Sequence, residues 1–296
     1  MNPSELLDRV AAIARRAGAL ILEVYGTDFA VAAKSDASPV TLADERAEAL
    51  IVAELERLDP ATPIVAEEAV AAGRVPSIER GRFWLVDPLD GTREFVARNG
   101  EFTVNIALVE HGRPVLGVVH APALGRTYAG AVGAVGAVGA SGGKGAVGAA
   151  GAAGASGAAW MEDAAGRRPI RCRTPPPAGL TVVASRSHGD AQALERFLAG
   201  RRVASLASAG SSLKLCLVAA GEADLYPRLG RTMEWDIAAG HAIVAAAGGQ
   251  VSRIDDGTPL AYGKPGFDNP HFVASGLSAQ ASGRPPDRGP APLRTA

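Results

Sequence analysis

The chain has 296 residues and a formal net charge of −1, which is enough length for one large domain or two fused subdomains. Its 30 basic and 31 acidic residues create no global basic field, which argues against nucleic-acid polymers and anionic membranes as partners. The start of the chain lacks a signal-peptide pattern, no run reaches the roughly 18 apolar residues of a membrane span, and Cys172 and Cys216 form no CxxC pair. We therefore expect a cytoplasmic protein with reduced cysteines and no membrane span.

The first part of the chain has the pattern of two helices followed by strands. Apolar residues at three- and four-residue spacing predict helices over residues 5–24 and 42–58. The segment PIVAEEA then predicts a short strand that ends at Glu67 and Glu68. Further along, FTVNIALVEHGRPVLGVVHAP predicts a β-hairpin, because two strand-like runs flank a turn that begins at His111.

Residues 129–159 consist almost only of Gly, Ala, Ser and Val. Such a segment offers few side chains to bury, so we predict a flexible surface insertion. The pair Gly143-Lys144 suggests a phosphate-binding loop. A Walker A motif is excluded, because Val138 and Gly145 stand where that motif requires Gly and Ser or Thr.

From about residue 179 strands and helices alternate. Strands are predicted at LTVVASRS and ADLYPR, and helices at DAQALERFLAG, SSLKLCLVAAG and WDIAAGHAIVAAAGG, the last ended by Gly248-Gly249. We predict an α/β fold, an α+β layered sandwich, with an N-terminal metal-binding half over residues 1–178 and a C-terminal half over 179–276. Residues 277–296 are predicted to be a disordered tail.

Two carboxylates follow the apolar run that opens WLVDPLDGTREF. Asp87 and Asp90 stand three apart, and Pro88 and Gly91 force the chain to turn there. Both carboxylates and the Leu89 carbonyl can then face one point beyond the strand end, a set of oxygen ligands suited to Mg²⁺. An ordinary turn whose aspartates bond their own backbone is the alternative.

Three more acidic positions are ambiguous in the same way. Glu67, with Glu68, ends a strand, where solvated loop charges are common. Asp236 begins a helix, where an aspartate often serves as a cap, and Asp44 lies three residues after Thr41, as in a capping box. None of these positions indicates a metal site alone.

Together, the motifs resemble the inositol-monophosphatase superfamily of Mg²⁺-dependent, lithium-sensitive phosphatases. Within it the chain is most similar to bacterial 3′(2′),5′-bisphosphate nucleotidases of the CysQ type. The resemblance covers about residues 4–275, and its segments, in order, are SPVTLAD, VAEE, WLVDPLDGTREFVARNGEFTVNIALVEHGRPVLGVVHAP, SRSH, GSSLKLCLVAAGEADLYPR and WDIAAGHAIVAAAGG. It implies the layered fold of inositol monophosphatase and fructose bisphosphatase. The Gly/Ala segment and the tail depart from the family pattern but touch no motif.

The resemblance implies two Mg²⁺ ions and leaves a third, weaker one near Asp44 and Glu67 open. The implied ligands are Glu67, Asp87 and the Leu89 carbonyl for one ion, and Asp87, Asp90 and Asp236 for the other. Asp44, Thr92 and Glu67 are the implied catalytic residues, and Asp44 and Thr92 orient and deprotonate the attacking water. A covalent aspartyl-phosphate is not expected, because a D-x-D-x-T motif places its two acids two residues apart.

A second group of residues is implied to hold the substrate. Ser211, Ser212 and Lys214 begin a predicted helix, where free N–H groups and a cation favour an anion, although a capped surface helix is the alternative. By resemblance, Ser211, Lys214 and Arg228 contact a non-reacting 5′-phosphate and His188 contacts an adenine. A solvated arginine and a plain loop histidine are the alternatives for Arg228 and His188. The implied substrate-binding set also contains Glu67, Leu89, Asp90, Gly91, Thr92 and Asp236.

The activity implied by the resemblance is removal of the 3′-phosphate from adenosine 3′,5′-bisphosphate, which gives AMP and phosphate, in sulfur assimilation. A second implied substrate is 3′-phosphoadenylyl sulfate, which would give adenylyl sulfate. The alternatives are an inositol- or sugar-phosphate phosphatase on the same fold and, in another class, an inactive phosphate-binding protein. Peripheral binding to the inner face of the cell membrane and the oligomeric state stay open.

Overall fold

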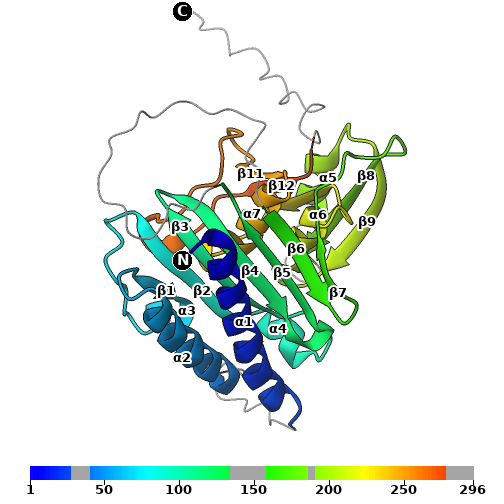
Figure 1. The fold of residues 1–296 in the computed structure, drawn as a ribbon. Helices are drawn as coiled ribbons and strands as arrows, with labels where there is room; N and C mark the ends of the chain where they lie inside the picture. Colours follow the sequence, from blue (N-terminus) through cyan, green and yellow to red (C-terminus); the bar gives the residue numbers. More distant parts are fainter. Residues whose placement is uncertain (28–40, 134–157, 186–190, 278–296) are drawn as a thin grey trace, which may run out of the picture.

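The computed structural model describes residues 1–27, 41–133, 158–185 and 191–277, and it contains two sheets with helices layered against them (Figure 1). The first sheet has seven strands that lie in chain order. Its first two strands are parallel and the others are antiparallel. The strands are β1 (Ile64–Ala66), β2 (Arg82–Asp90), β3 (Thr103–Glu110), β4 (Arg113–Ala121), β5 (Arg126–Ala131), β6 (Ala158–Asp163) and β7 (Gly166–Pro169).

Both faces of this sheet are covered, which is why β2 and β3 read as nearly continuous apolar runs. Trp84 and Val86 of β2 pack in one core cluster with α1 (Pro3–Tyr25) and α2 (Thr41–Leu58). Phe83 and Leu85 point to the opposite face and join a second cluster with α7 (Glu234–Ala246). Alternate side chains of one strand therefore fill two different cores.

The second sheet has five strands in the order β11-β12-β10-β8-β9. Strand β8 (Leu180–Ser185) is parallel to β9 (Val203–Ala209) and β10 (Leu225–Arg228). Strand β12 (Phe272–Ser275) is antiparallel to β10 and β11 (Gln250–Arg253). The remaining short elements are α3 (Glu67–Ala71), α4 (Thr92–Val96), η1 (Pro122–Leu124), α5 (Ala191–Leu198), α6 (Leu213–Ala219) and η2 (Pro265–Phe267).

Helix α7 lies against the first sheet although its sequence belongs to the predicted C-terminal half (Figure 1). Two glycines of the sheet allow its close approach. A Cβ at Gly117 of β4 would lie 2.2 Å from the Ala239 carbonyl oxygen, and one at Gly130 of β5 would lie 2.9 Å from Ile243 Cα. This contact fixes the N-terminus of α7, which carries Asp236, relative to the first sheet.

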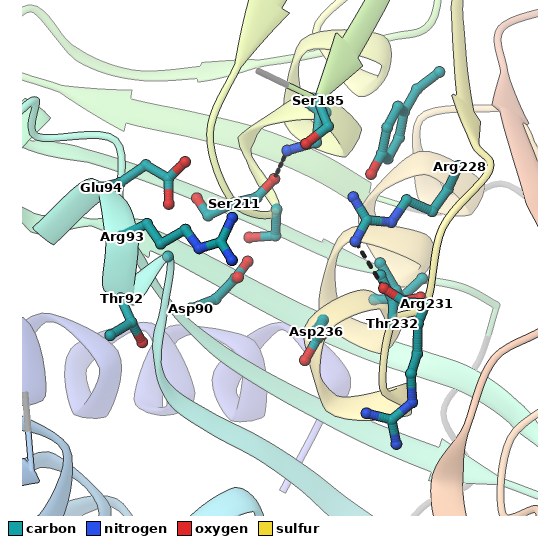
Figure 2. A pocket seen from close by; sticks show the side chains of 15 residues that line it. Asp90, Thr92, Arg93, Glu94, Ser185, Ser211, Arg228, Arg231, Thr232 and Asp236 are labelled. Carbon is teal, nitrogen blue, oxygen red and sulfur yellow. Dashed lines mark hydrogen bonds between the residues drawn. The ribbon is translucent and has the colours of Figure 1, made fainter. Parts of the chain in front are cut away.

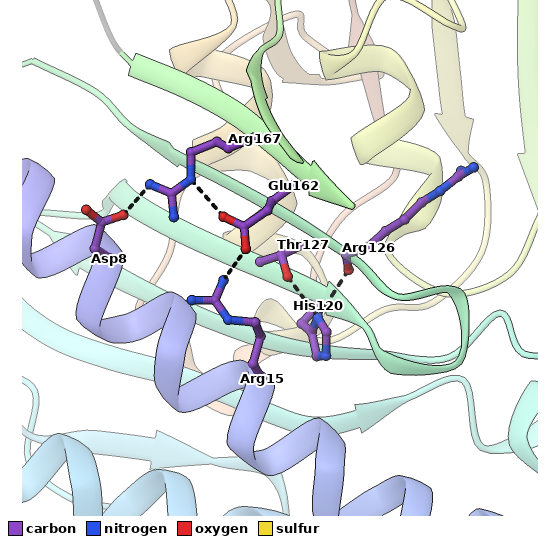
Figure 3. A network of polar contacts seen from close by, with 7 residues as sticks. All are labelled: Asp8, Arg15, His120, Arg126, Thr127, Glu162 and Arg167. Atoms are coloured by element: carbon purple, nitrogen blue, oxygen red, sulfur yellow. Dashed lines mark hydrogen bonds and ion pairs between the residues drawn. The ribbon is translucent and has the colours of Figure 1, made fainter. Parts of the chain in front are cut away.

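On the outer face, α1 is tied to β6 and β7 by a group of ion pairs (Figure 3). Arg167 contacts Asp8 at 2.6 Å and Glu162 at 2.8 Å, and Arg15 contacts Glu162 at 3.2 Å. In the same region, His120 Nδ1 lies 3.0 Å from Thr127 Oγ1. Burial lowers the pKa of His120 to about 4, which keeps its ring neutral near pH 7.

The predicted α/β layered fold is confirmed, as are the helices over 5–24 and 42–58 and the β3–β4 hairpin. The flexible insertion was placed too widely, because residues 129–131 belong to β5 and residues 158 and 159 to β6. Its remainder from 134 to 157 and the tail after 277 lie outside the described residues. The division into halves at 178/179 stays a prediction. Among the helices that the structure describes, none is long and apolar enough to cross a membrane.

Candidate active site

A β-bulge at the end of β2 shapes the first part of the site. Asp87 pairs with Asn105 of β3 and Asp90 with Thr103, so Pro88 and Leu89 together oppose a single residue. Asp87 is only 1% exposed, and its Oδ1 accepts the Leu89 N–H at 3.0 Å. The local turn bond expected of such an aspartate is therefore present, but the second carboxylate oxygen remains for another ligand.

Gly91 follows the bulge and lets the chain pass close to the second half of the protein. Its φ of +94° is accessible to glycine and strained for other residues. A Cβ at this position would lie 3.2 Å from Ser211 Cβ and 3.3 Å from the Glu101 carbonyl oxygen. Thr92 then begins α4.

Four carboxylates from three segments gather around the end of β2. Glu67 follows β1, which is parallel to β2, so it stands beside Asp87. Burial, followed by the charges of Asp90 and Glu68, raises the pKa of Glu67 to about 7. Burial and the charges of Glu67, Asp90 and Asp236 raise the pKa of Asp87 well above its usual value.

Asp236 has two roles at the start of α7. Its Oδ2 accepts the Met233 N–H at 2.9 Å, so Asp236 is not the N-cap but the third helical residue, which bonds back to the N-cap Met233. Its pKa is also raised well above the usual value, first by burial and then by the charge of Asp90. The charge of Arg228 lowers this pKa and so partly offsets the neighbouring acids.

Asp44 lies on α2 among further acids. Burial, and then the charges of Glu68, Glu67 and Glu48, raise its pKa to about 8. The Glu48 carboxylate accepts the Glu68 N–H at 2.9 Å, which connects α2 to α3. The predicted capping box cannot be compared, because the side chain of Thr41 lies outside the described residues.

Asp90 is surrounded by groups that stabilise its charge. Burial raises its pKa, whereas Lys214, the Ser212 N–H and the Asn105 side chain lower it. Ser212 Oγ donates to Asn105 Oδ1 at 2.7 Å and lies 2.8 Å from Thr103 Oγ1. A buried polar network therefore joins the end of β2, strand β3 and the loop before α6.

The anion site expected at the start of α6 is largely used by the protein itself. The Gly210 N–H donates to the Glu101 carboxylate at 2.8 Å, and the Ser211 hydroxyl donates to the Glu101 carbonyl at 2.9 Å. Lys214 Nζ donates to the carbonyls of Ala209 at 3.1 Å and Ser211 at 2.5 Å. Burial lowers the pKa of Lys214 to about 8. The anion site at Ser211, Ser212 and Lys214 stays a prediction; the sequence did not indicate that Glu101 reaches this loop.

A pocket of about 300 Å³ is lined by residues of both sheets, among them Asp90 of β2 and Arg228 of β10 (Figure 2). Its lining includes two carboxylates, Asp90 and Asp236, and two cations, Arg228 and Lys214. The two acids are called the carboxylate pole and the two cations the cationic pole. Other predicted residues that line it are Gly91, Thr92, Ser211 and Ser212, and the residues that the sequence did not single out include Arg93, Ser185, Tyr226, Arg231 and Thr232.

Arg228 is held at the pocket wall but is incompletely bonded. It is 9% exposed, and one of its terminal nitrogens donates to the Arg231 carbonyl at 2.7 Å (Figure 2). Arg228 Nε and Thr232 Oγ1 are both buried and have no hydrogen-bond partner among the described residues. Both residues line the pocket, so a ligand bound there could supply the missing partners. A solvated surface arginine, the alternative for Arg228, is excluded.

The structure does not bring all predicted residues to the same surface. Glu67, Asp87, Leu89 and Asp44 do not line the pocket, and no hydrogen bond links Thr92 to Asp44 within the described residues. His188 lies outside the described residues. In the part of the chain that the structure describes, no three His, Cys, Asp or Glu side chains already stand in metal-binding geometry.

The carboxylates nevertheless fit a hard divalent cation. Asp87 is a buried oxygen donor and Glu67, Asp90 and Asp236 are half-buried ones, and all four have raised pKa values. Lys214 acts on Asp90 and Arg228 on Asp236, which leaves Glu67 and Asp87 with no cation among the main influences on their pKa values. A divalent ion between them would stabilise the ionised forms, and Mg²⁺ prefers this donor chemistry.

Comparison with known proteins decides the family. The profile of the inositol monophosphatase family matches residues 2–282. This chain belongs to the inositol monophosphatase family. The family is metal-dependent, in agreement with the chemistry of the carboxylate cluster.

Within the inositol monophosphatase family, the chain is similar to several proteins named CysQ. The 3′(2′),5′-bisphosphate nucleotidase CysQ of Escherichia coli K12 is 44% identical over 273 residues, which cover 91% of this chain and 99% of that protein. The CysQ of Buchnera aphidicola is 37% identical and covers 92% of this chain and 94% of its own. The crystal structure of CysQ from Bacteroides thetaiotaomicron superposes with a TM-score of 0.70 at 34% identity, over 91% of this chain and 97% of that one.

Inositol monophosphatases of the same family share the fold at lower identity. The enzyme from Anabaena has a TM-score of 0.66 and 26% identity, and the match covers 92% of this chain and 90% of that one. The family membership and the observed layers confirm the resemblance predicted from the motifs.

Proposed function

We propose that this chain is a Mg²⁺-dependent phosphatase that removes the 3′-phosphate of adenosine 3′,5′-bisphosphate, which gives AMP and phosphate. The observation that supports it most directly is the pocket with two poles. Asp90 and Asp236 form one pole, and Arg228 with Lys214 forms the other. A ligand that matches this pocket carries one phosphate for the carboxylate side and a second anionic group for the cationic side. The relatives named as bisphosphate nucleotidases agree with it.

The carboxylates at the end of β2, together with Glu67 and Asp236, are proposed to hold the metal. Glu67, Asp87 and the Leu89 carbonyl would bind one ion, and Asp87, Asp90 and Asp236 a second, while a third near Asp44 and Glu67 remains a proposal. When bound, the ions supply Lewis-acid stabilisation of the phosphoryl oxygens and lower the pKa of the attacking water. The backbone bonds of Asp87 and Asp236 keep one oxygen of each carboxylate fixed while the other is directed to the ligand.

Asp44 and Thr92 are proposed to act on the attacking water. The buried Asp44 carboxyl, with a pKa of about 8, holds a proton more strongly than an exposed aspartate. Compensation of the neighbouring acids by a cation would lower this pKa and ionise Asp44, and the carboxylate could then accept a proton from the attacking water. Thr92 begins α4 directly after Gly91, which places it at the rim of the pocket beside Asp90.

The cationic pole is proposed to position the rest of the substrate. Arg228 offers its buried, unpartnered Nε to the 5′-phosphate. Lys214 supplies positive charge from the pocket floor, and its bonds to the Ala209 and Ser211 carbonyls also hold the loop that carries Ser211. Loss of Lys214 should therefore impair every substrate, whereas loss of Arg228 should impair mainly those with a 5′-phosphate.

The same reacting end is present in 3′-phosphoadenylyl sulfate, so we propose that compound as a second substrate. The contact of His188 with adenine, the cytoplasmic location and a place in sulfur assimilation stay predictions. No observation supports attachment to the inner face of the membrane.

The proposal is tested by phosphate release with Mg²⁺ from adenosine 3′,5′-bisphosphate, inositol 1-phosphate and fructose 1,6-bisphosphate at matched concentrations. We expect the highest kcat/KM for the adenosine compound. A higher value for either of the others would identify an inositol- or sugar-phosphate phosphatase. Release from none of the three would support a phosphate-binding protein without activity.

A further inference from the structure

The loop between β10 and α7 joins the two poles of the pocket. It begins after Arg228 and ends before Glu234, two residues before Asp236. Both of its sides are fixed: the Arg231 carbonyl accepts from Arg228 at 2.7 Å, and the Thr232 carbonyl accepts the Asn269 N–H at 2.9 Å. A side chain on this loop therefore comes, along the chain, between Arg228 and Asp236, which both line the pocket.

On this loop, Thr232 carries a hydroxyl group that forms no hydrogen bond within the described part of the protein. The side chain lines the pocket, is 7% exposed, and has no hydrogen-bond partner for Oγ1 among the described residues (Figure 2). A buried hydroxyl without a partner destabilises the free protein, and a valine of nearly the same shape would avoid this cost. A threonine at this place is explained if a ligand supplies the missing partner.

We propose that Thr232 binds the 2′-hydroxyl of the substrate ribose and so determines specificity for ribonucleotides. The inference rests on the proposed function. In adenosine 3′,5′-bisphosphate the sugar lies between the two phosphates, and the 2′-hydroxyl is its only free hydroxyl group. A substrate that places one phosphate at Asp236 and the other at Arg228 must bring its sugar past the loop that carries Thr232. A threonine hydroxyl can both donate to and accept from a sugar hydroxyl.

The free protein keeps this hydroxyl away from water, so binding requires a small movement. Rotation about the Cα–Cβ bond exchanges the positions of the hydroxyl and methyl groups and needs no change in the backbone. The bond to the substrate then replaces an unsatisfied group in the free protein, which makes the contact selective against a ligand that lacks the 2′-hydroxyl.

The test is a cycle that removes each hydroxyl in turn. We would measure kcat/KM of the wild type and Thr232→Val for adenosine 3′,5′-bisphosphate and its 2′-deoxy analogue. The wild type should prefer the ribonucleotide by about tenfold, the effect of one neutral hydrogen bond. Thr232→Val should act on both compounds at the rate the wild type shows with the deoxy analogue, and Thr232→Ser should restore the preference.

The unfolding temperature of the ligand-free protein provides a second measurement. If Thr232 had a structural role, its replacement by valine would lower this temperature. Thr232→Val should leave the unfolding temperature unchanged or raise it, because it removes an unpaired buried hydroxyl. The matched control is Thr127→Val, whose buried hydroxyl bonds His120 far from the pocket. That variant should unfold at a lower temperature and keep the wild-type preference for the ribonucleotide.

Two results separate failure of this inference from failure of the proposed function. If Thr232→Val is active and discriminates between the two nucleotides as the wild type does, Thr232 does not bind the 2′-hydroxyl. An equal loss with both nucleotides would likewise overturn it and place Thr232 against a phosphate. If the wild type releases phosphate from neither nucleotide, the proposed function fails and this assignment fails with it.

Discussion

At the scale of single residues, the acids of this site combine local and functional roles. Asp87 accepts a backbone N–H two residues ahead, and Asp236 accepts one three residues behind. Because a carboxylate has two oxygens, these local bonds do not compete with a ligand; they orient it. A local backbone bond and the proposed role as a metal ligand are therefore compatible in one carboxylate.

The adjacent acids Glu67 and Glu68 allow a direct test of the ligand assignment. Glu67→Gln should lower kcat by more than about a hundredfold, because it removes charge from the metal pole, a loss of at least about 2.7 kcal/mol. Glu68→Gln, at the next position of the same helix, should stay within a few-fold of wild type. Circular dichroism and the unfolding temperature check that both variants fold. Comparable losses in the two variants would remove Glu67 from the set of ligands.

A pH-dependent stability follows from the buried Asp44. Its pKa is about 8 in the folded protein against a usual value of 3.8, so between these values the folded state holds a proton that the unfolded state has released. The free energy of unfolding therefore decreases as pH rises through this range, by up to about 1.4 kcal/mol per pH unit. This contribution to stability is complete below pH 3.8 and lost above about pH 8.

This pH dependence is measured by thermal unfolding of the wild type and of Asp44→Asn between pH 5 and 9, in the presence of a chelator. The wild type should lose more stability than the variant as pH rises, and the curves should run parallel above about pH 8. Parallel curves across the whole range would show that Asp44 is not the buried, proton-holding group described here.

At the scale of elements, much of the architecture could be predicted because burial leaves a periodic pattern. Helix α1 shows three- and four-residue spacing, and the β3–β4 hairpin shows two strand-like runs around a turn. Strand β9 was not predicted, since six of its seven residues are exposed and small or polar residues interrupt it. Strands β11 and β12 have only four residues each, too few for a clear period.

In the site, too, the contacts that could not be predicted are those that leave no local pattern in the sequence. The motifs predicted a set of acids and cations from short, specific segments, and of these Asp90, Asp236, Lys214 and Arg228 line the pocket. They did not indicate that Glu101 occupies the Gly210 N–H, or that Thr232 and Arg93 line the pocket. These contacts join residues far apart in the chain, and no local spacing encodes them.

The packing of α7 on the sheet gives a prediction at this scale. Gly117→Ala should destabilise the protein by about 1–3 kcal/mol or more, because the added methyl group meets helix backbone that cannot move alone. It should also lower activity, since α7 carries Asp236. The control is Gly26→Ala, where the φ is −74° and the added carbon would meet its nearest neighbour at 3.4 Å. Urea unfolding of the two variants measures the difference; equal stabilities would contradict the close contact described here.

At the scale of the whole molecule, the site is assembled from both sheets. Strand β2 and helix α4 supply Asp90 and Thr92, whereas β10 and α7 supply Arg228 and Asp236. The predicted halves meet at the pocket, and α7 crosses from one to the other. The N-terminal half supplies Asp90, and the C-terminal half supplies Asp236, Arg228 and Lys214.

The segment between β5 and β6 should be dispensable for this assembly. Ala131 pairs directly with Ala158, so an Asn-Gly turn replacing residues 132–157 can close the hairpin without disturbing the pair. We expect turnover within a few-fold of wild type, measured on adenosine 3′,5′-bisphosphate with Mg²⁺. A folded variant that loses more than about tenfold would show that the segment contributes to the site.

The central claim, removal of a 3′-phosphate from a bisphosphate nucleotide, is tested most directly by identifying the nucleotide product. Adenosine 3′,5′-bisphosphate would be incubated with the protein and Mg²⁺, with a chelator control, and the nucleotides separated by chromatography. The account predicts one equivalent of phosphate and adenosine 5′-monophosphate as the sole product, formed only when the metal is present. Accumulation of adenosine 3′-monophosphate, or an unchanged bisphosphate, would contradict it.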